Sequence, residues 1–430
     1  MEDGALSFPK ADGSEPPPPD TQANPVSTSI WREQAFWFIL TLNFAWAAVY
    51  NFLPVTFPVF RRFFHASFEE LGRSQFLFFI AGLFFSVIGG WFVDRLGLKR
   101  ATVVTLVCLA CSVAFIGAAW SFRLVLVDAF LFGLAVAALT VVYSAMTCEC
   151  YPEKRQSVFL ISGIAGGVGG VLGPTVQGKW LLQAERTGAS WGASYYAAAG
   201  LLGLLIMWAM LLRRGTLPER KLNMDGITGP TSAMKSIITK PAMHAIGLAY
   251  LIHGVAQGGM ISWVGQVYQS RHSINNAQAA YFISFELMGM LAGRSTLSWI
   301  TARWKIPDLL LLAVCAAATT LAFAATLISG TYPAGLISFA IAGFFVSGNG
   351  PAISSYTGMR FGDQTATAFA ILGGIGNIGS AGGPYLIGFL GARFSLETGI
   401  WLMPVSMLAL AIFAFGWFLR TDRRHPAVPC

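Results

Sequence analysis

One carboxyl group in this chain lies where an acid is costly to keep. Glu286 is alone among the acids in lying at the middle of an apolar segment of helix length. A charge at the centre of a membrane costs about 2.5 to 3.5 kcal/mol on insertion scales, so such residues usually have a function. His253 lies at about the same depth on the preceding segment, counted from the cytosolic side. A buried histidine and glutamate can hold one exchangeable proton, so we predict a proton-coupling pair of Glu286 and His253. The alternative is a static hydrogen-bonded pair, or a neutral glutamic acid bonded to the backbone.

Amides, hydroxyls and aromatic rings recur at the middle of the apolar segments. Asn43, Trp46 and Tyr50 share one helix face at steps of three and four residues, and Thr140 and Tyr143 do so on a later segment. Sugar rings stack on aromatic faces while their hydroxyls exchange hydrogen bonds with amides, so these groups suit a neutral polyol. The predicted substrate-binding residues are Asn43, Trp46, Tyr50, Thr140, Tyr143, His253, Gln257, Asn349 and Asn377. Trp46 and Tyr143 could equally be packing aromatics, and Asn377 an interhelical hydrogen bond.

Cations and metal-binding patterns are missing from the middle of the segments. Arg123, Lys179 and Arg294 each lie within a turn or two of a predicted segment end. A carrier of phosphate esters or dicarboxylates would be expected to keep a central cation, so anionic solutes are disfavoured. The sequence has no HExxH, no paired central aspartates and no nucleotide-binding loop. We therefore expect neither an enzyme nor an ATP-driven pump, and no metal or cofactor.

The elements that hold these side chains are apolar. Of the 430 residues, 55% are hydrophobic and 11% are charged, against about 25% charged in a soluble domain. Twelve runs are long enough to cross a bilayer as helices. They cover residues 33–56, 74–94, 100–120, 124–148, 156–183, 193–213, 239–264, 277–299, 307–328, 333–357, 366–391 and 398–420.

A glycine-rich stretch occurs twice. GIAGGVGGVLGPTVQG at 163–178 aligns without gaps with GGIGNIGSAGGPYLIG at 373–388. We interpret this as a duplicated half, and predict an all-α polytopic membrane protein whose twelve transmembrane helices form two pseudo-symmetric six-helix bundles in the same orientation. Small residues on one helix face allow close approach, and proline kinks a helix. Beyond plain tight packing, we predict a helix-packing seam that can rock, formed by Gly169, Gly173, Pro174, Gly379, Gly383 and Pro384.

The chain divides into five parts. We predict a disordered cytosolic tail at 1–32, bundles at 33–213 and 239–420, a cytosolic linker at 214–238 and a cytosolic tail at 421–430. All but eight of the 28 Lys and Arg then lie on the side of the termini, as the positive-inside rule requires. We expect a multi-pass protein of the plasma membrane with both termini cytosolic. The pI of 9.3 would reflect contact with the inner leaflet, not with nucleic acid.

The stretch GWFVDRLGLKR, from Gly90 to Arg100, resembles the loop signature of the major facilitator superfamily, GxxxDRxGxxR. The resemblance implies a transporter in which helices one, four, seven and ten line a central cavity, which places most of the candidate residues on the pathway. It also implies a conformational latch on the cytosolic side. The latch residues would be Gly90, Asp94, Arg95, Gly97 and Arg100. The matching stretch of the second half, WITARWK at 299–305, has no acid, so the latch is expected to be one-sided.

Two looser stretches, 285–297 and 348–370, resemble the sugar-proton symporters of the fucose permease group. That resemblance implies secondary active symport of a neutral sugar or similar small polar solute. Tyr50 and Thr140 stand where the group carries membrane acids, so protons would not follow its usual route. The alternatives are an exporter of amphipathic drugs or metabolites, consistent with 34 Phe and 13 Trp, an uncoupled facilitator, or a membrane-embedded enzyme or sensor. We expect a monomer whose partners are a small-molecule solute, the lipid bilayer and protons.

Overall fold

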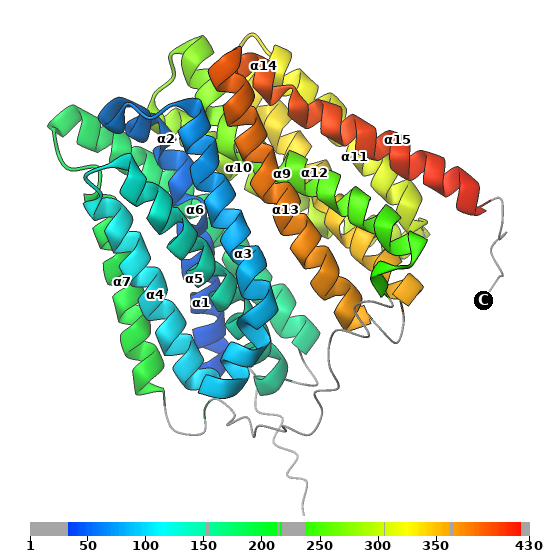
Figure 1. The fold of residues 1–430 in the computed structure, drawn as a ribbon, viewed down its shortest axis with the longest axis horizontal. Helices are drawn as coiled ribbons and strands as arrows, with labels where there is room; N and C mark the ends of the chain where they lie inside the picture. Colours follow the sequence, from blue (N-terminus) through cyan, green and yellow to red (C-terminus); the bar gives the residue numbers. More distant parts are fainter. Residues whose placement is uncertain are drawn as a thin grey trace, which may run out of the picture.

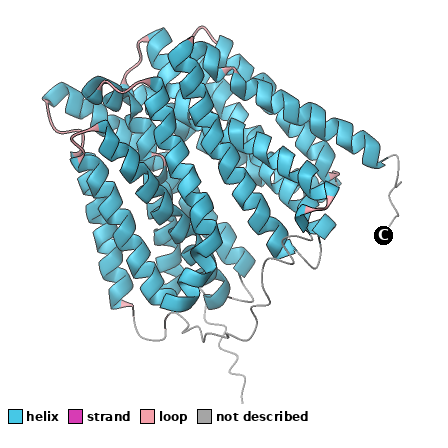
Figure 2. Ribbon diagram, viewed as in Figure 1, coloured by secondary structure: helices cyan, strands magenta, loops and turns pink. Residues whose placement is uncertain are grey.

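A computed structural model describes residues 33–151, 155–212, 216, 237–304, 306–361 and 365–422. Within these ranges the chain is helical, with short connections and no strand (Figure 2). The predicted tail at 1–32, most of the predicted linker and residues 423–430 lie outside them. The prediction of an all-helical membrane fold with two bundles is confirmed.

The first half contains seven helical elements that form six spans. Its elements are α1 (Gln34–Tyr50), α2 (Phe52–Phe64), α3 (Phe68–Leu96), α4 (Leu98–Ala118), α5 (Phe122–Cys150), α6 (Arg155–Thr187) and α7 (Ala193–Leu211). The elements α1 and α2 form one apolar span that is interrupted at Asn51. Pro54 explains the break, because it has no N–H to donate to the carbonyl of Tyr50.

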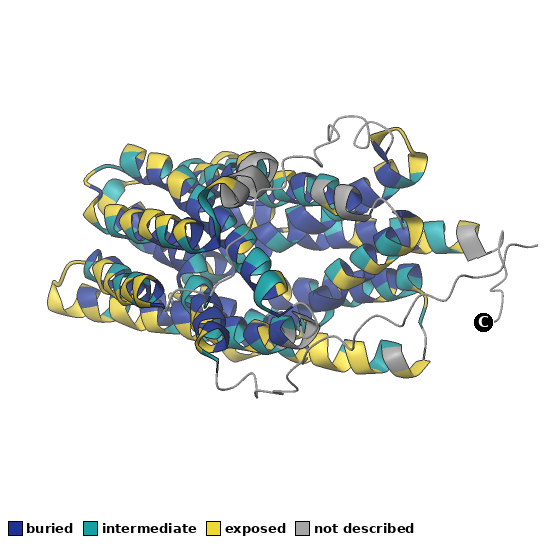
Figure 3. Ribbon diagram, turned by 90° about the horizontal axis from the view of Figure 1, so that it is seen from below, coloured by how far each residue is buried: buried dark blue, intermediate teal, exposed yellow. Residues whose placement is uncertain are grey.

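The second half repeats this order. Its elements are α9 (Pro241–His272), α10 (Asn276–Trp304), α11 (Asp308–Ile328), α12 (Tyr332–Phe361), α13 (Thr365–Arg393), α14 (Leu396–Ile400) and α15 (Leu402–Asp422). Among the described residues, eight segments have the length and hydropathy to span a membrane. The other long helices, α3, α6, α10 and α13, are those that join the two halves, α3 with α13 and α6 with α10. Seen along the bundle, buried residues face the interior and exposed residues cover the outer faces (Figure 3).

The duplicated glycines make the same contacts in both halves. A Cβ added to Gly169 or Gly173 of α6 would come within 2.2 or 1.9 Å of the backbone oxygens of Phe44 and Ala48 in α1. A Cβ added to Gly379 of α13 would meet the oxygen of Leu251 in α9 at 2.3 Å. Gly383 repeats this contact with the oxygen of Val255, at 2.0 Å. These glycines therefore let two backbones touch inside each half. For these four glycines the close packing is inside each half, and the rocking motion of the predicted seam stays a prediction.

Other small residues bring the halves together at one end. We call this end, where α3 begins and α6 ends, the far end, and the end where α7 stops and α9 starts the linker end. At the far end a Cβ on Gly72 would lie 2.8 Å from the oxygen of Pro384, and one on Gly388 would lie 2.4 Å from that of Phe68. A Cβ on Gly178 would likewise lie 2.5 Å from the Cβ of Ala280.

The halves separate toward the linker end (Figure 1). There, a Cβ on Gly163 of α6 or Gly373 of α13 would meet nothing within 4 Å. Slightly further from that end, Gly167 and Gly374 face only the side-chain tips of Leu291 and Leu83. The structure is therefore closed at the far end and wedge-shaped toward the linker end.

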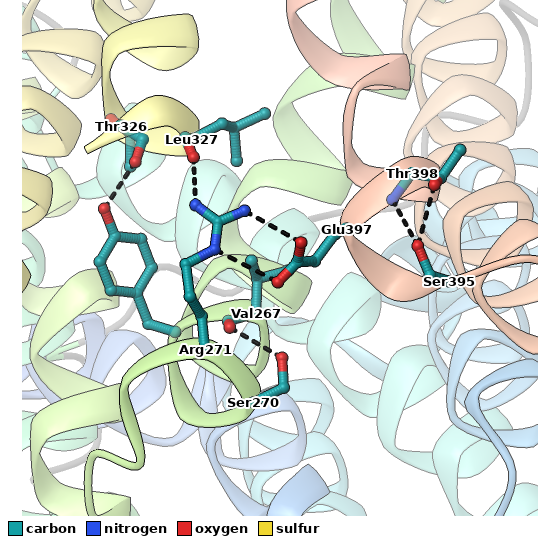
Figure 4. Close-up of polar contacts among 9 residues, drawn as sticks. Val267, Ser270, Arg271, Thr326, Leu327, Ser395, Glu397 and Thr398 are labelled. Atoms are coloured by element: carbon teal, nitrogen blue, oxygen red, sulfur yellow. Dashed lines mark hydrogen bonds and ion pairs between the residues drawn. The ribbon is translucent and has the colours of Figure 1, made fainter. Parts of the chain in front are cut away.

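Polar contacts hold the far end of the second half. Arg271 at the end of α9 pairs with Glu397 of α14 at 3.2 Å and donates to the carbonyl of Leu327 in α11 (Figure 4). Ser395 accepts from the backbone N–H of Thr398 and so caps α14 (Figure 4). Three helices of this half are thus tied together beside the closed end of the interface.

Candidate transport site

A cavity of about 360 Å³ lies between the two halves. Its walls come from α1, α2, α3 and α6 of the first half and from α9, α10 and α13 of the second. This volume is in the range of small-molecule sites. The polar and aromatic residues that line it include Asn43, Trp46, Tyr50, Asn51, Gln75, Phe78, Phe79, Gln257, Ser262, Arg294 and Ser380.

The predicted face of α1 points into this cavity. Asn43, Trp46 and Tyr50 all line it. The amide nitrogen of Asn43 donates to the backbone oxygen of Ser162 at 2.7 Å, and the Tyr143 hydroxyl lies 2.6 Å from the Ser162 hydroxyl. Asn43 and Tyr143 are therefore oriented by α6. The Asn43 side chain presents its remaining polar groups from a fixed position.

Aromatic rings form a second wall. The Trp46 and Tyr50 rings meet edge to face with centroids 5.6 Å apart, and Tyr50 meets Phe78 at 5.4 Å. These three rings also line an adjoining cavity of about 320 Å³, together with Thr140 and Asn377. The aromatic wall therefore separates two chambers, and Thr140 and Asn377 belong to the second.

Of the predicted substrate-binding residues in the second half, some line a cavity and others are buried away from it. Gln257 lines the main cavity, whereas His253 and Asn349 are buried and line neither chamber. The His253 ring packs beside that of Tyr250 with centroids 6.1 Å apart, and the amide nitrogen of Asn349 lies 3.6 Å from the sulfur of Met407. These two side chains belong to the packing of the second half.

The structure does not join Glu286 to His253. Glu286 is fully buried, and within the described part of the chain neither of its carboxyl oxygens, nor the Nδ1 atom of His253, has a hydrogen-bond partner. Glu286 packs beside Gly343 of α12, whereas His253 lies beside Gly350. Seven helical residues separate these two glycines, about 10 Å along the axis. The matched depth expected from the sequence needs correction, because α10 continues to Trp304, five residues beyond the predicted end.

Arg294 is a cavity residue that the sequence reasoning placed elsewhere. The extension of α10 to Trp304 puts Arg294 about 15 Å from the end of the helix. Its side chain is exposed and lines the main cavity. No ion pair or hydrogen bond joins Arg294 to another described residue. The argument against anionic solutes depended on Arg294 lying near a helix end, so that argument fails.

The predicted latch is described only in part. Gly97 connects α3 to α4 with φ +74°, a conformation that favours glycine. Next to it, Lys99 donates to the backbone oxygen of Leu212 at 2.7 Å, just beyond the end of α7. Arg95 and Arg100 are exposed. The surroundings of Gly90 and Asp94 are not described by the structure, so the latch stays a prediction.

Comparison with known proteins gives one family and a common fold. A sequence model of the Major Facilitator Superfamily matches residues 37–333 and 309–429. No curated protein matches the chain. Among solved structures, an inward-facing, unoccupied bacterial homolog of the human lysosomal transporter Spinster aligns with TM-score 0.69 and 17% identity, over 90% of this chain and 96% of its own.

Two further structures are similar. A mutant of the nucleoside transporter NupG aligns with TM-score 0.74 and 13% identity, over 89% of this chain and all of its own. The E. coli fucose:proton symporter FucP aligns with TM-score 0.59 and 18% identity, over 89% of this chain and 98% of its own. At these identities the similarity concerns the fold, which is shared by proteins with different solutes.

Proposed function

This chain belongs to the major facilitator superfamily and is an integral, multi-pass membrane transporter, not an enzyme, and we propose that it carries a small polar solute through the cavity between its halves. The observation that carries the proposal is the main cavity itself. It combines a volume of about 360 Å³ with walls from both halves. A solute held there would contact both bundles at once, as alternating access requires.

The walls of the cavity support a solute with hydroxyl groups. Asn43, Gln75 and Gln257 offer amide donors and acceptors, and Trp46 and Tyr50 offer aromatic faces. A sugar or a similar polyol is therefore the first class to test. The same aromatic faces would also accept part of an amphipathic molecule, so an exporter is the outcome to test against.

Proton coupling through Glu286 remains part of the proposal. Its carboxyl group is buried and unbonded within the described chain, and an acid in that setting prefers to be neutral. His253 would take part only if the helices moved. Asp128 is the second candidate for the proton, buried between α4 and α5 with the Ser112 hydroxyl 3.0 Å from both of its oxygens.

We further propose that the linker end faces the cytosol of a plasma membrane, from the distribution of Lys and Arg.

A ligand screen on the purified protein tests the solute class. The full chain in detergent is heated with neutral sugars and polyols, organic acids, and amphipathic amines, and the unfolding midpoint is recorded. A solute that binds only the folded protein raises this midpoint, by an amount that grows with the logarithm of its concentration above the dissociation constant. Stabilisation by hydroxylated solutes supports the proposal. Stabilisation by amphipathic amines alone would favour the exporter.

Uptake into proteoliposomes then tests transport and its coupling. Accumulation that needs an inward proton gradient is the expected result. Equilibration without accumulation would identify an uncoupled facilitator.

A further inference from the structure

The main cavity has a positively charged residue on its wall, Arg294, and no acidic residue of the described chain lines the cavity beside it. The other polar groups on its wall are amides, hydroxyls and an indole. A guanidinium group facing a membrane cavity is costly unless water or an anion accompanies it.

We propose that Arg294 binds an anionic group of the solute, so that the transported molecule is a small hydroxylated monocarboxylate such as a sugar acid or a short hydroxy acid. This inference rests on the function proposed above and names its solute class. A guanidinium presents two parallel N–H donors that match a carboxylate. The amides of Gln257 and Asn43 in the same cavity would then bind the hydroxyl groups.

The nearest acid on the same helix is Glu286, which precedes Arg294 by eight residues, about 12 Å along the axis. The two side chains attract each other electrostatically at a distance, but both carboxyl oxygens of Glu286 lack a hydrogen-bond partner in the described chain, so they form no direct ion pair with Arg294. Glu286 is fully buried and outside the cavity wall, whereas Arg294 is exposed. The alternative to a ligand-binding role is that the Arg294 side chain extends to water at the linker end and binds no solute.

The size and charge of the cavity limit the anion. One cation lines the described wall, so one negative charge can be balanced there. A phosphate ester carries nearly two charges at neutral pH and would keep one of them unbalanced. Glycerate and glycerol 3-phosphate therefore distinguish the carboxylate from the phosphate.

The test compares matched acids and neutral molecules on the full purified chain. Galacturonate is paired with galactose, and glycerate with glycerol, and the dissociation constant of each is obtained from thermal shift and isothermal titration. We expect the acid of at least one pair to bind at least about tenfold more tightly than its neutral partner, a difference of about 1.4 kcal/mol. Arg294→Gln should remove this preference, and Arg294→Lys should keep part of it.

Arg303→Gln is the control, because Arg303 is an exposed arginine at the end of the same helix and does not line the cavity. It should leave binding of the acid unchanged. Both Arg294 variants must elute as the wild type does and unfold at a similar temperature without solute, and the lysine variant keeps the test valid if the glutamine variant aggregates.

Three results would overturn the inference. Equal binding of acid and neutral partner would leave the proposed polar solute in place but without an anionic group. Preference for the phosphate over glycerate would replace the carboxylate. Binding of neither class, together with stabilisation by amphipathic amines, would remove the proposed function as well.

Discussion

The glycine contacts inside each half give a prediction whose size follows from the coordinates. A Cβ on Gly173 would lie 1.9 Å from the backbone oxygen of Ala48, whereas ordinary contact begins near 3.4 Å. The Gly173→Ala change therefore requires α1 and α6 to move apart by about 1.5 Å. Backbone atoms meet on both sides, so no side chain can rotate away. Overpacking of this kind costs about 1 to 3 kcal/mol, and we expect the upper part of that range.

A matched control lies on the same helix. Gly163 has open space at its Cβ position, so Gly163→Ala should gain up to about 1 kcal/mol from helix propensity alone. Gly173→Ala gains the same amount, which leaves a net loss of about 2 kcal/mol. For a chain of 430 residues that unfolds as one unit, this corresponds to a fall of about 2 °C in the unfolding temperature.

The second half provides an independent repeat of the experiment. Gly383 faces the oxygen of Val255 at 2.0 Å, and Gly373 faces open space. The four purified alanine variants are unfolded by heat in one detergent, and unfolding is followed by intrinsic fluorescence. The Gly173→Ala and Gly383→Ala variants should unfold at lower temperatures than the Gly163→Ala and Gly373→Ala variants. If all four unfold within about 1 °C of the wild type, the close helix contacts are not those described, and the reasoning fails.

Three further changes test other parts of the molecule. Asp94→Asn should loosen the predicted latch and increase labelling of cysteines placed in the cavity, since a charge that prefers a helix N-terminus is lost; unchanged labelling with normal transport would argue against a latch. Glu185→Ala removes the ion pair to Arg62 and the 3.1 Å hydrogen bond from Asn276 of the other half. Because the ion pair is exposed, its loss should lower the free energy of unfolding by less than about 1 kcal/mol. The change should nevertheless make cysteines placed in the cavity more reactive toward a membrane-impermeant thiol reagent added at the far end. Unchanged reactivity would mean that backbone packing alone closes this end. Glu286→Gln should abolish gradient-driven accumulation and keep exchange of solute, because the amide hydrogen-bonds but does not titrate; a variant that still accumulates solute would move the proton to Asp128.

Apolar length predicted the helices well but not their ends. Hydropathy predicts a span over 277–299, whereas the helix continues to Trp304. The added residues, ITARW after Trp299, are helix-compatible but mix polar and aromatic groups, so hydropathy falls before the helix ends. This error shifted the apparent depth of Glu286 and placed Arg294 at a helix end. Residue spacing alone could not reveal it, because the end of the membrane and the end of the helix differ.

The sequence predicted those cavity residues that lie together on one face of a single helix. Asn43, Trp46 and Tyr50 line the cavity because steps of three and four residues share a face. The same spacing does not say which neighbour the face meets, and His253 consequently turned out to lie in the core of its half. Gln75 lines the cavity from the first turns of α3, near three charged residues of its own helix end, so nothing in its local sequence indicated it.

The two kinds of helix contact imply where the molecule can move. Inside each half the glycines of α6 and α13 bring backbone against backbone, a contact that tolerates almost no sliding because carbonyl oxygens occupy the place of side chains. Between the halves, toward the linker end, Gly167 and Gly374 meet only leucine side chains, which can change rotamer as the helices separate. Motion should therefore occur along the α6/α10 and α3/α13 boundaries, with α1 carried by α6 and α9 carried by α13. Rotation of either half would then change the contacts of a solute bound to α1 and α9, because each of these helices moves with its bundle as a rigid unit.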